Sequence, residues 1–129
     1  MEASGVVLLV EDDEKTNKAN RHALEFRRFT VHTATSFAEA HRLLGKLQPD
    51  IIMMEVNLPD GDGFDFCKRI YGVTDANIVF LTSKTGNEDM VRGIQAGGDE
   101  YINKPYYKDE MIARVEALMR RRKPLQASV

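Results

Sequence analysis

The chain has 129 residues, carries a net charge of −2 and has a sequence pI of about 5.9. This length suits one domain, and a chain that is 43% hydrophobic and 29% charged can build an ordinary globular core. The weakly acidic balance excludes nucleic-acid binding by charge alone.

The cysteine count and the hydropathy pattern limit the cellular compartment in which the chain is expected. A single cysteine, Cys67, excludes an intrachain disulfide and argues against a cysteine metal site. No run of roughly 18 apolar residues is present, so we expect no membrane span. The first residues lack a basic segment followed by a long apolar one, so we expect no signal peptide. A reducing cytoplasm fits these features.

The first half of the chain alternates apolar runs with helical patterns. Residues 6–10, VVLLV, form a continuous apolar run that predicts a strand buried on both faces. Ser36 and Glu39 have the spacing of a capping box, which predicts the start of a helix, and Pro49 ends that helix. The expected order is a strand over 6–10, a helix over about 14–28, a strand over 29–33 and a helix over about 37–47.

The second half continues the alternation. The expected elements are a strand over 51–54, a loop over 58–63, a helix over 64–71, a strand over 78–81, a helix capped by Asn87 that stops at Gly97, a strand over 101–102 and a helix over 108–122. The basic run at 120–123, RRRK, is expected to be the solvated end of the last helix, where cations suit the helix dipole.

Five strands that alternate with five helices predict an α/β fold with a parallel sheet covered on both faces. Because crossovers are right-handed, the carboxyl ends of the strands share one edge. Binding sites of open α/β sheets lie in the crevice at that edge. We therefore look for chemistry at the strand ends.

Acids, hydroxyls and one ammonium group follow four of the expected strands. These are Glu11, Asp12 and Asp13 after the first, Glu55 after the third, Thr82 and Ser83 after the fourth, and Lys104 after the fifth. Clustered carboxylates suit a hard divalent cation such as Mg²⁺. A hydroxyl and a lysine suit phosphoryl oxygens, and an acid beside them could carry a phosphoryl group. Each feature alone has a plainer interpretation as a helix cap, a turn or a surface charge.

Five motifs together resemble the receiver domains of bacterial two-component response regulators, over about residues 6–122. They are LLVEDDE, PDIIMMEVNLPDGDGF, IVFLTSK, GGDEYINKPY and ARVEALMRR. The resemblance implies a flavodoxin-like, doubly wound sheet with strand order 2-1-3-4-5. We expect the receiver domain to occupy residues 1–123, with a tail or the start of a linker over 124–129.

The resemblance also implies roles for individual residues. Glu11 and Asp12 would hold Mg²⁺, with Asp12 as the direct ligand, while the backbone carbonyl of Asn57 and the acid at position 55 complete the metal pocket. The remaining roles fall on the last two strands: Thr82 and Lys104 would contact the phosphoryl group, Tyr101 would be the aromatic switch that turns inward when the hydroxyl of Thr82 moves, and Pro105 would follow a cis peptide bond. Asp60 and Asp62 are expected to shape the loop without accepting phosphate.

Glu55 departs from the family pattern, which has the phosphoacceptor Asp at this position. Glu reaches roughly 1.5 Å further, about one carbon–carbon bond. Phosphoryl transfer depends on in-line geometry, so we expect phosphorylation to be lost or weakened, and Mg²⁺ binding with it. One interpretation places the carboxylate near Lys104 and Thr82 and mimics an activated receiver. A second pairs Glu55 with Lys104 and locks an inactive state. A third makes Glu55 an engineered or still reactive acceptor in a conventional phosphorelay receiver.

The resemblance is to the transcription-factor branch with winged-helix output domains. It implies a histidine kinase as partner, which the domain would no longer need if phosphorylation is lost, and DNA binding only through an output domain. Arg92, Glu100, Glu110 and Arg114 fall where that branch makes cross-subunit ion pairs, which predicts a homodimer through the fourth helix, fifth strand and fifth helix. The plainer interpretation of these residues is ordinary exposed charge.

Two functions of other classes compete with a signalling domain. A Mg²⁺-dependent phosphohydrolase would need a second acid two residues after its nucleophile; Glu14 follows Asp12 in this way but is expected to start a helix. A flavin or nucleotide carrier would need a loop rich in Gly, Ser or Thr after the first strand, where this chain has four acids. We therefore do not expect an enzyme.

Overall fold

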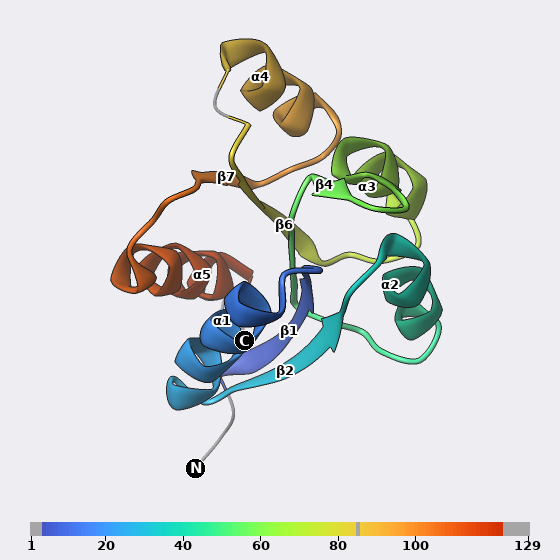
Figure 1. Cartoon of the computed structure of the whole chain (residues 1–129). Helices are drawn as coiled ribbons and strands as arrows, with labels where there is room; N and C mark the ends of the chain where they lie inside the picture. Colours follow the sequence, from blue (N-terminus) through green and yellow to red (C-terminus); the bar gives the residue numbers. More distant parts are fainter. Residues whose placement is uncertain (1–3, 85, 123–129) are drawn as a thin grey trace, which may run out of the picture.

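The computed structural model describes residues 4–84 and 86–122, which form one α/β unit (Figure 1). The tail expected at 124–129 lies outside the described residues. No helix within the described ranges is long and apolar enough to cross a membrane.

One five-stranded sheet forms the centre of the molecule. Its strands are β1 (Gly5–Val10), β2 (Phe29–Ala34), β3 (Ile51–Met54), β6 (Asn77–Thr82) and β7 (Glu100–Asn103). The order is β2-β1-β3-β6-β7, and every neighbouring pair is parallel. Since β6 and β7 are the fourth and fifth strands of this sheet, the predicted order and fold class are confirmed.

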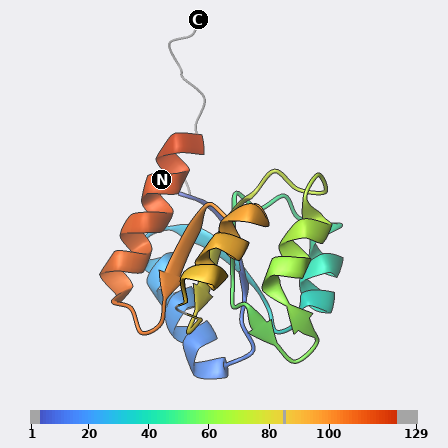
Figure 2. The same ribbon diagram turned by 90° about the horizontal axis from the view of Figure 1, so that it is seen from above.

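Helices cover both faces of the sheet. They are α1 (Glu14–Phe26), α2 (Phe37–Leu44), α3 (Gly63–Ile70), α4 (Asn87–Gln95) and α5 (Lys108–Arg122). Figure 2 shows α1 and α5 on one side of the sheet, and α2 and α3 on the other with α4 near them. Successive strand residues point to opposite faces, so Leu8 joins the core under α2 and α3 while Leu9 joins the core under α1 and α5. Burial on both faces explains the unbroken apolar runs.

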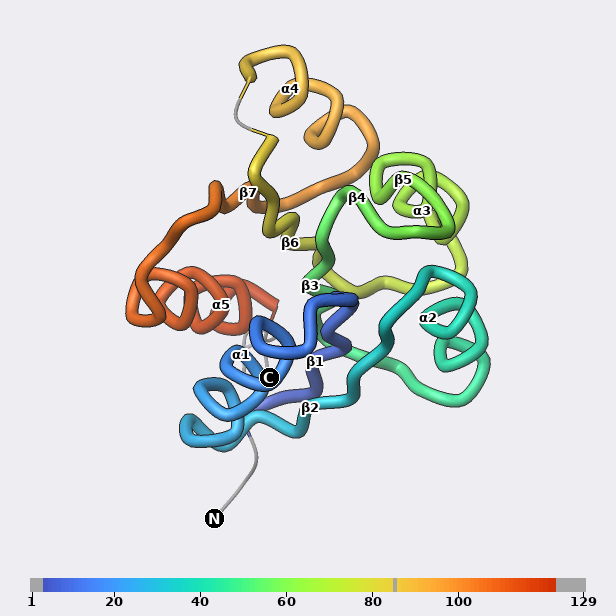
Figure 3. Tube along the Cα trace, viewed as in Figure 1, coloured from blue at the N-terminus to red at the C-terminus, as the bar shows by residue number. Residues whose placement is uncertain are grey.

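Two local predictions are wrong. The loop expected over 58–63 contains a short antiparallel hairpin, β4 (Asn57–Leu58) and β5 (Gly61–Asp62), which leads directly into α3 (Figure 3). Asn87 does not cap α4, because it is already the first helical residue; Gly86 holds the cap position and makes no side-chain bond there. Ser36 does cap α2, by accepting a 3.1 Å hydrogen bond from the Glu39 backbone N–H.

Candidate functional site

Three polar side chains are buried at the carboxyl edge of the sheet. Glu11 follows β1, Glu55 follows β3 and Thr82 ends β6, and they are 2%, 8% and 0% exposed. Lys104, directly after β7, brings its ammonium group 2.9 Å from Oε1 of Glu11 and 2.9 Å from Oε1 of Glu55. The structure therefore brings together four of the residues that the sequence placed at this edge.

Both oxygens of Glu55 are held. Oε1 faces Lys104, and Oε2 accepts hydrogen bonds from the backbone N–H groups of Val56 at 2.6 Å and Asn57 at 3.2 Å. The longer side chain thus turns back over its own backbone and still reaches the lysine. A buried carboxylate held in this way is well compensated and has a fixed orientation.

Glu11 is fixed by neighbours on both sides. Its Oε2 accepts a hydrogen bond from the Asp13 backbone N–H at 3.2 Å, and its Oε1 accepts one from Lys104. Burial raises the pKa of Glu11 above its ordinary value, and these hydrogen bonds offset that rise only in part. Burial alone would lower the pKa of Lys104, but its hydrogen bonds to Glu55 and Glu11 raise it overall. The lysine therefore stays charged and bridges the two acids.

The residues predicted to bind Mg²⁺ offer the right kind of donor, because carboxylate and carbonyl oxygens are what this ion prefers. Asp12 is exposed beside the buried Glu11, and Asn57 begins β4 next to Glu55. In the described ranges, however, no three His, Cys, Asp or Glu side chains are grouped so as to hold a metal ion. Lys104 already pairs with both Glu11 and Glu55, so these two acids would have to turn from it to hold Mg²⁺.

The predicted switch residues both contact the segment that follows β6. The Thr82 hydroxyl accepts a 3.1 Å hydrogen bond from the Lys84 backbone N–H, and the Tyr101 hydroxyl donates a 2.7 Å bond to the Lys84 carbonyl. The ring of Tyr101 packs beside Phe64 and Phe80, with centroids 6.4 and 6.0 Å away. Burial, followed by the charges of nearby acids, raises the pKa of Tyr101 to about 12. Tyr101 is therefore fixed between β6, α3 and α4.

Asp60 and Asp62 shape the hairpin, as predicted, and they do so by capping helices. Asp60 accepts hydrogen bonds from the backbone N–H groups of Phe37 and Ala38, at 3.1 and 3.0 Å, and so caps α2 from a distant part of the chain. Asp62 caps α3 by accepting from Phe64 N–H at 2.7 Å. Negative charge at a helix N-terminus also suits the helix dipole.

Sequence reasoning missed one buried pair next to the site. Asn20, in the middle of α1, is 3% exposed and donates a 2.7 Å hydrogen bond to the Tyr106 hydroxyl. Tyr106 follows Pro105, whose bond to Lys104 is cis as expected. The only available signal was an amide among the apolar positions of a helix, which is easily read as an exposed residue.

Three of the four residues predicted for a dimer face contact one another within the chain. The Arg114 guanidinium lies 2.8 Å from Glu100 and 3.1 Å from Glu110. Arg92 lies apart from them, with its guanidinium 4.9 Å from the Phe64 ring centroid and 3.9 Å from Asp62. Arg92 thus connects α4 to α3, so the proposed set of residues is split between two places.

Arg120 and Arg121, at the basic end of α5, are exposed as predicted, whereas Arg122 is half-buried and Lys123 lies outside the described residues. Arg122 donates to the Asp75 carbonyl at 2.9 Å and to Asn77 Oδ1 at 3.2 Å, and lies 3.7 Å from Asp50. Arg121 lies 4.0 Å from Glu100. These contacts tie the helix end to the amino-terminal side of the sheet.

The family is decided by a comparison with protein-family models. The model for the response regulator receiver domain matches residues 7–116, which is most of the chain. The chain belongs to this family. Glu11, Glu55, Thr82 and Lys104, to which the resemblance gives roles in signalling, lie together at the carboxyl edge of the sheet.

Relatives and solved structures agree with this assignment. Response regulator MprA of Mycobacterium tuberculosis is 33% identical over 123 residues, covering 95% of this chain and 54% of that protein. An uncharacterised transcriptional regulatory protein, YvcP, of Bacillus subtilis is 31% identical, covering 89% and 48%. A two-component response regulator from Clostridium difficile has a TM-score of 0.89 at 28% identity, covering 92% and 98%. The receiver chain spans about half the length of these curated relatives.

Proposed function

We propose that this receiver domain signals without phosphorylation of position 55 and regulates an attached DNA-binding output domain. The observation that carries the proposal is the engagement of both Glu55 oxygens, one by Lys104 and the other by the backbone of Val56 and Asn57. Names of relatives such as response regulator and transcriptional regulatory protein support the output domain.

The geometry disfavours Glu55 as a nucleophile. Attack on a phosphorus atom needs an oxygen that points into the site and lies in line with the leaving group. Oε1 instead pairs with a lysine and Oε2 points at its own backbone. A misplacement near 1 Å can cost on the order of a hundredfold in rate. The extra methylene of Glu therefore works against transfer.

The position of Tyr101 favours an active-like state over a locked inactive one. The pair between Glu55 and Lys104 fits both interpretations, because each of them places the carboxylate near Lys104. The resemblance also gives Tyr101 an inward position when the switch is on, and here its ring packs on Phe64 while its hydroxyl bonds Lys84. We propose that Glu55 substitutes for the phosphoryl charge.

The test is phosphorylation by a small-molecule donor. The purified chain and a Glu55→Asp variant are incubated with Mg²⁺ and acetyl phosphate, and intact mass is measured. The expected result is no change for the parent chain and the gain of one phosphoryl mass for the variant. Uptake by the parent chain would show a conventional phosphorelay receiver with a reactive Glu55, and the proposal would be wrong.

The proposal has consequences for the metal ion, the kinase and the dimer. Glu11, Asp12, Glu55 and the Asn57 carbonyl would hold Mg²⁺ with reduced affinity, and the ion would supply charge neutralisation for a phosphoryl group. A histidine kinase would then be dispensable for output. Arg92, Glu100, Glu110 and Arg114 remain candidates for a homodimer face on α4, β7 and α5, although each already has a partner within the chain.

A further inference from the structure

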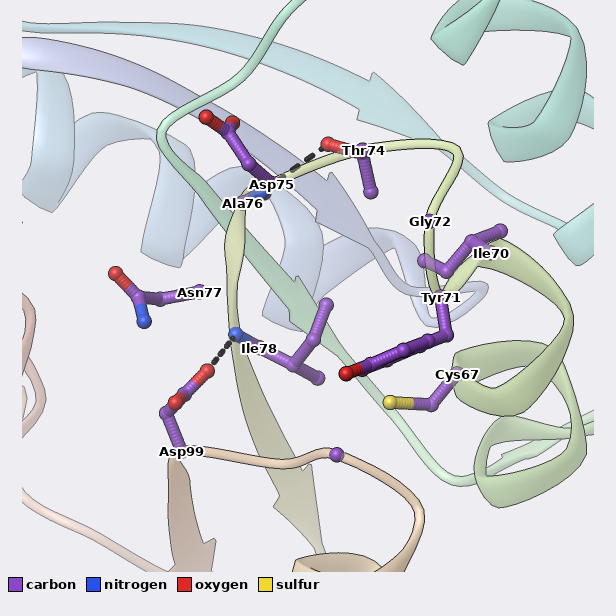
Figure 4. A pocket seen from close by; sticks show the side chains of 11 residues that line it. Cys67, Ile70, Tyr71, Gly72, Thr74, Asp75, Ala76, Asn77, Ile78 and Asp99 are labelled. Carbon is purple, nitrogen blue, oxygen red and sulfur yellow. Dashed lines mark hydrogen bonds between the residues drawn. The ribbon is translucent and has the colours of Figure 1, made fainter.

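A cavity lies away from the carboxyl edge of the sheet. It has a volume of about 440 Å³ and sits between the end of α3, the segment before β6 and the segment after α4 (Figure 4). Its lining includes Cys67, Ile70, Tyr71 and Ile78, with Asp75 and Asp99 at its polar side. This volume is in the range of pockets that hold small organic ligands, roughly 300–1,000 Å³.

We propose that this cavity binds a small organic cation, an ammonium or guanidinium group attached to an apolar body. The site is independent of the function proposed for Glu55, because none of the residues that line the cavity belongs to the cluster at the carboxyl edge of the sheet. The argument rests on the charge of the cavity, its aromatic wall and the position of Asp99.

The charge of the cavity is one-sided. Asp75 and Asp99 line it, and no lysine, arginine or histidine of the described chain does. Arg122 lies 3.4 Å from Asp75, and both acids also line an adjoining pocket with Arg121 and Arg122. Asp75 is therefore already paired, and Asp99 is the carboxylate that a ligand cation would meet in this cavity.

Asp99 is the better placed of the two acids. Its Oδ2 accepts a 2.8 Å hydrogen bond from the Ile78 backbone N–H, which fixes the carboxylate beside the cavity. Its Oδ1 has no partner within the described part of the chain. Its charge is felt inside the cavity, because burial first and then Asp99 raise the pKa of the Cys67 thiol to about 11. Asp99 could thus accept a hydrogen bond from a ligand cation.

Tyr71 supplies the aromatic wall. The residue is 82% exposed, and in Figure 4 its hydroxyl end and the Cys67 sulfur both point toward the Ile78 side chain. A cation near an aromatic face gains attraction from the ring quadrupole. Ile70 and Ile78 are already buried, so the apolar body of the ligand would chiefly cover the exposed ring of Tyr71. An exposed tyrosine beside two acids and an apolar floor is a combination that suits this class of ligand.

The probe for the test is benzamidinium, with neutral benzamide as an isostere of the same shape. Amide signals of the ¹⁵N-labelled chain are followed by NMR during titration with each compound. The expected result is saturable shifts at Ile78, Gly97 and Asp99 with benzamidinium, with a Kd on the order of 1 mM for so small a ligand. Benzamide should bind about fivefold more weakly, the loss expected for one part-exposed ion pair.

Matched variants separate charge from shape. Asp99→Asn keeps an acceptor for Ile78 and removes the charge, so benzamidinium should bind about fivefold more weakly. Asp109→Asn, an exposed acid at the start of α5, should leave the affinity unchanged. Equal binding of the two compounds by the parent chain, or shifts centred on Glu11–Asp13, would overturn the proposal. A short arginine peptide that bound at least about tenfold more tightly than benzamidinium would instead assign the cavity to a protein partner.

Discussion

The Tyr101 hydroxyl donates a 2.7 Å hydrogen bond to the backbone carbonyl of Lys84, which joins β7 to the segment between β6 and α4. The ring is enclosed by neighbours as well, because a Cβ added at Gly93 would lie 3.0 Å from Tyr101 and 3.1 Å from Phe64. Tyr101, the predicted switch residue, is therefore coupled to α4 through direct packing. The fit is tight enough that a larger residue at position 93 would have to move one of the rings.

The Tyr101 phenol should ionise later than an unperturbed tyrosine. Its pKa is raised to about 12, whereas an unperturbed tyrosine titrates near 10. A spectrophotometric titration of tyrosinate should show a late component that diminishes in Tyr101→Phe. Tyr107→Phe, at an exposed position, should leave this late component in place. Loss of the late component from Tyr107→Phe and not from Tyr101→Phe would contradict the inward position of Tyr101.

Substitution of Glu55 should cost more stability than substitution of an exposed acid. Glu55→Gln leaves Lys104 with one carboxylate and places an amide donor against either the ammonium group or the backbone N–H groups. We expect a loss of about 1–3 kcal/mol in the free energy of unfolding, measured with urea.

Glu110→Gln is the matched control, because Glu110 pairs with Arg114 on an exposed helix face. Such pairs contribute roughly 0.3–0.5 kcal/mol. Similar losses for the two variants would mean that the buried contacts of Glu55 stabilise the fold no more than a surface pair.

Periodicity and strand-end logic predicted most of this fold. The unbroken apolar runs at 6–10 and 51–54 identified central strands, and alternation identified the parallel sheet. The polar residues brought together at the carboxyl edge followed from that topology alone. The functional state remained undetermined: both structural interpretations placed Glu55 near Lys104, and the sequence left open whether this contact mimics an activated receiver or locks an inactive one.

Contacts between distant segments were the other limit. Asp60 caps α2 from more than twenty positions away, and Asn20 meets Tyr106 across the gap between α1 and the loop after β7. No local pattern encodes such a pair, since both depend on how helices pack on the finished sheet. Arg92 shows the same limit, because no local pattern predicted that its guanidinium lies over the Phe64 ring.

Loss of the Asp60 cap should destabilise the domain in a pH-dependent way. Hydrogen bonds from the Ala38 and Phe37 N–H groups lower the pKa of Asp60 below its usual 3.8. The charged carboxylate is thus favoured in the folded state, so its contribution is present above the unfolded pKa and is lost as pH falls through the folded pKa. Asp60→Ala should cost about 1 kcal/mol at neutral pH, as measured by urea unfolding.

The difference between the parent chain and Asp60→Ala should shrink below about pH 3.8, where the parent carboxylate becomes protonated. Asp65→Ala, at an exposed acid in the first turn of α3, is the control. A constant difference across this pH range would show that Asp60 acts through its shape and not through its charge.

Cys67 should report opening of the cavity beside α3. The thiol is 3% exposed, donates to the Ala96 carbonyl at 3.1 Å, and has a pKa raised to about 11 by burial and by Asp99. Because the thiolate is the reactive form, a disulfide reagent at neutral pH should modify the folded chain far more slowly than free cysteine. Unfolding in urea should restore the full rate, and Asp99→Asn should leave the folded chain protected because burial is the larger cause. A folded chain that reacted as fast as free cysteine would place Cys67 in solvent and remove the closed wall of the cavity.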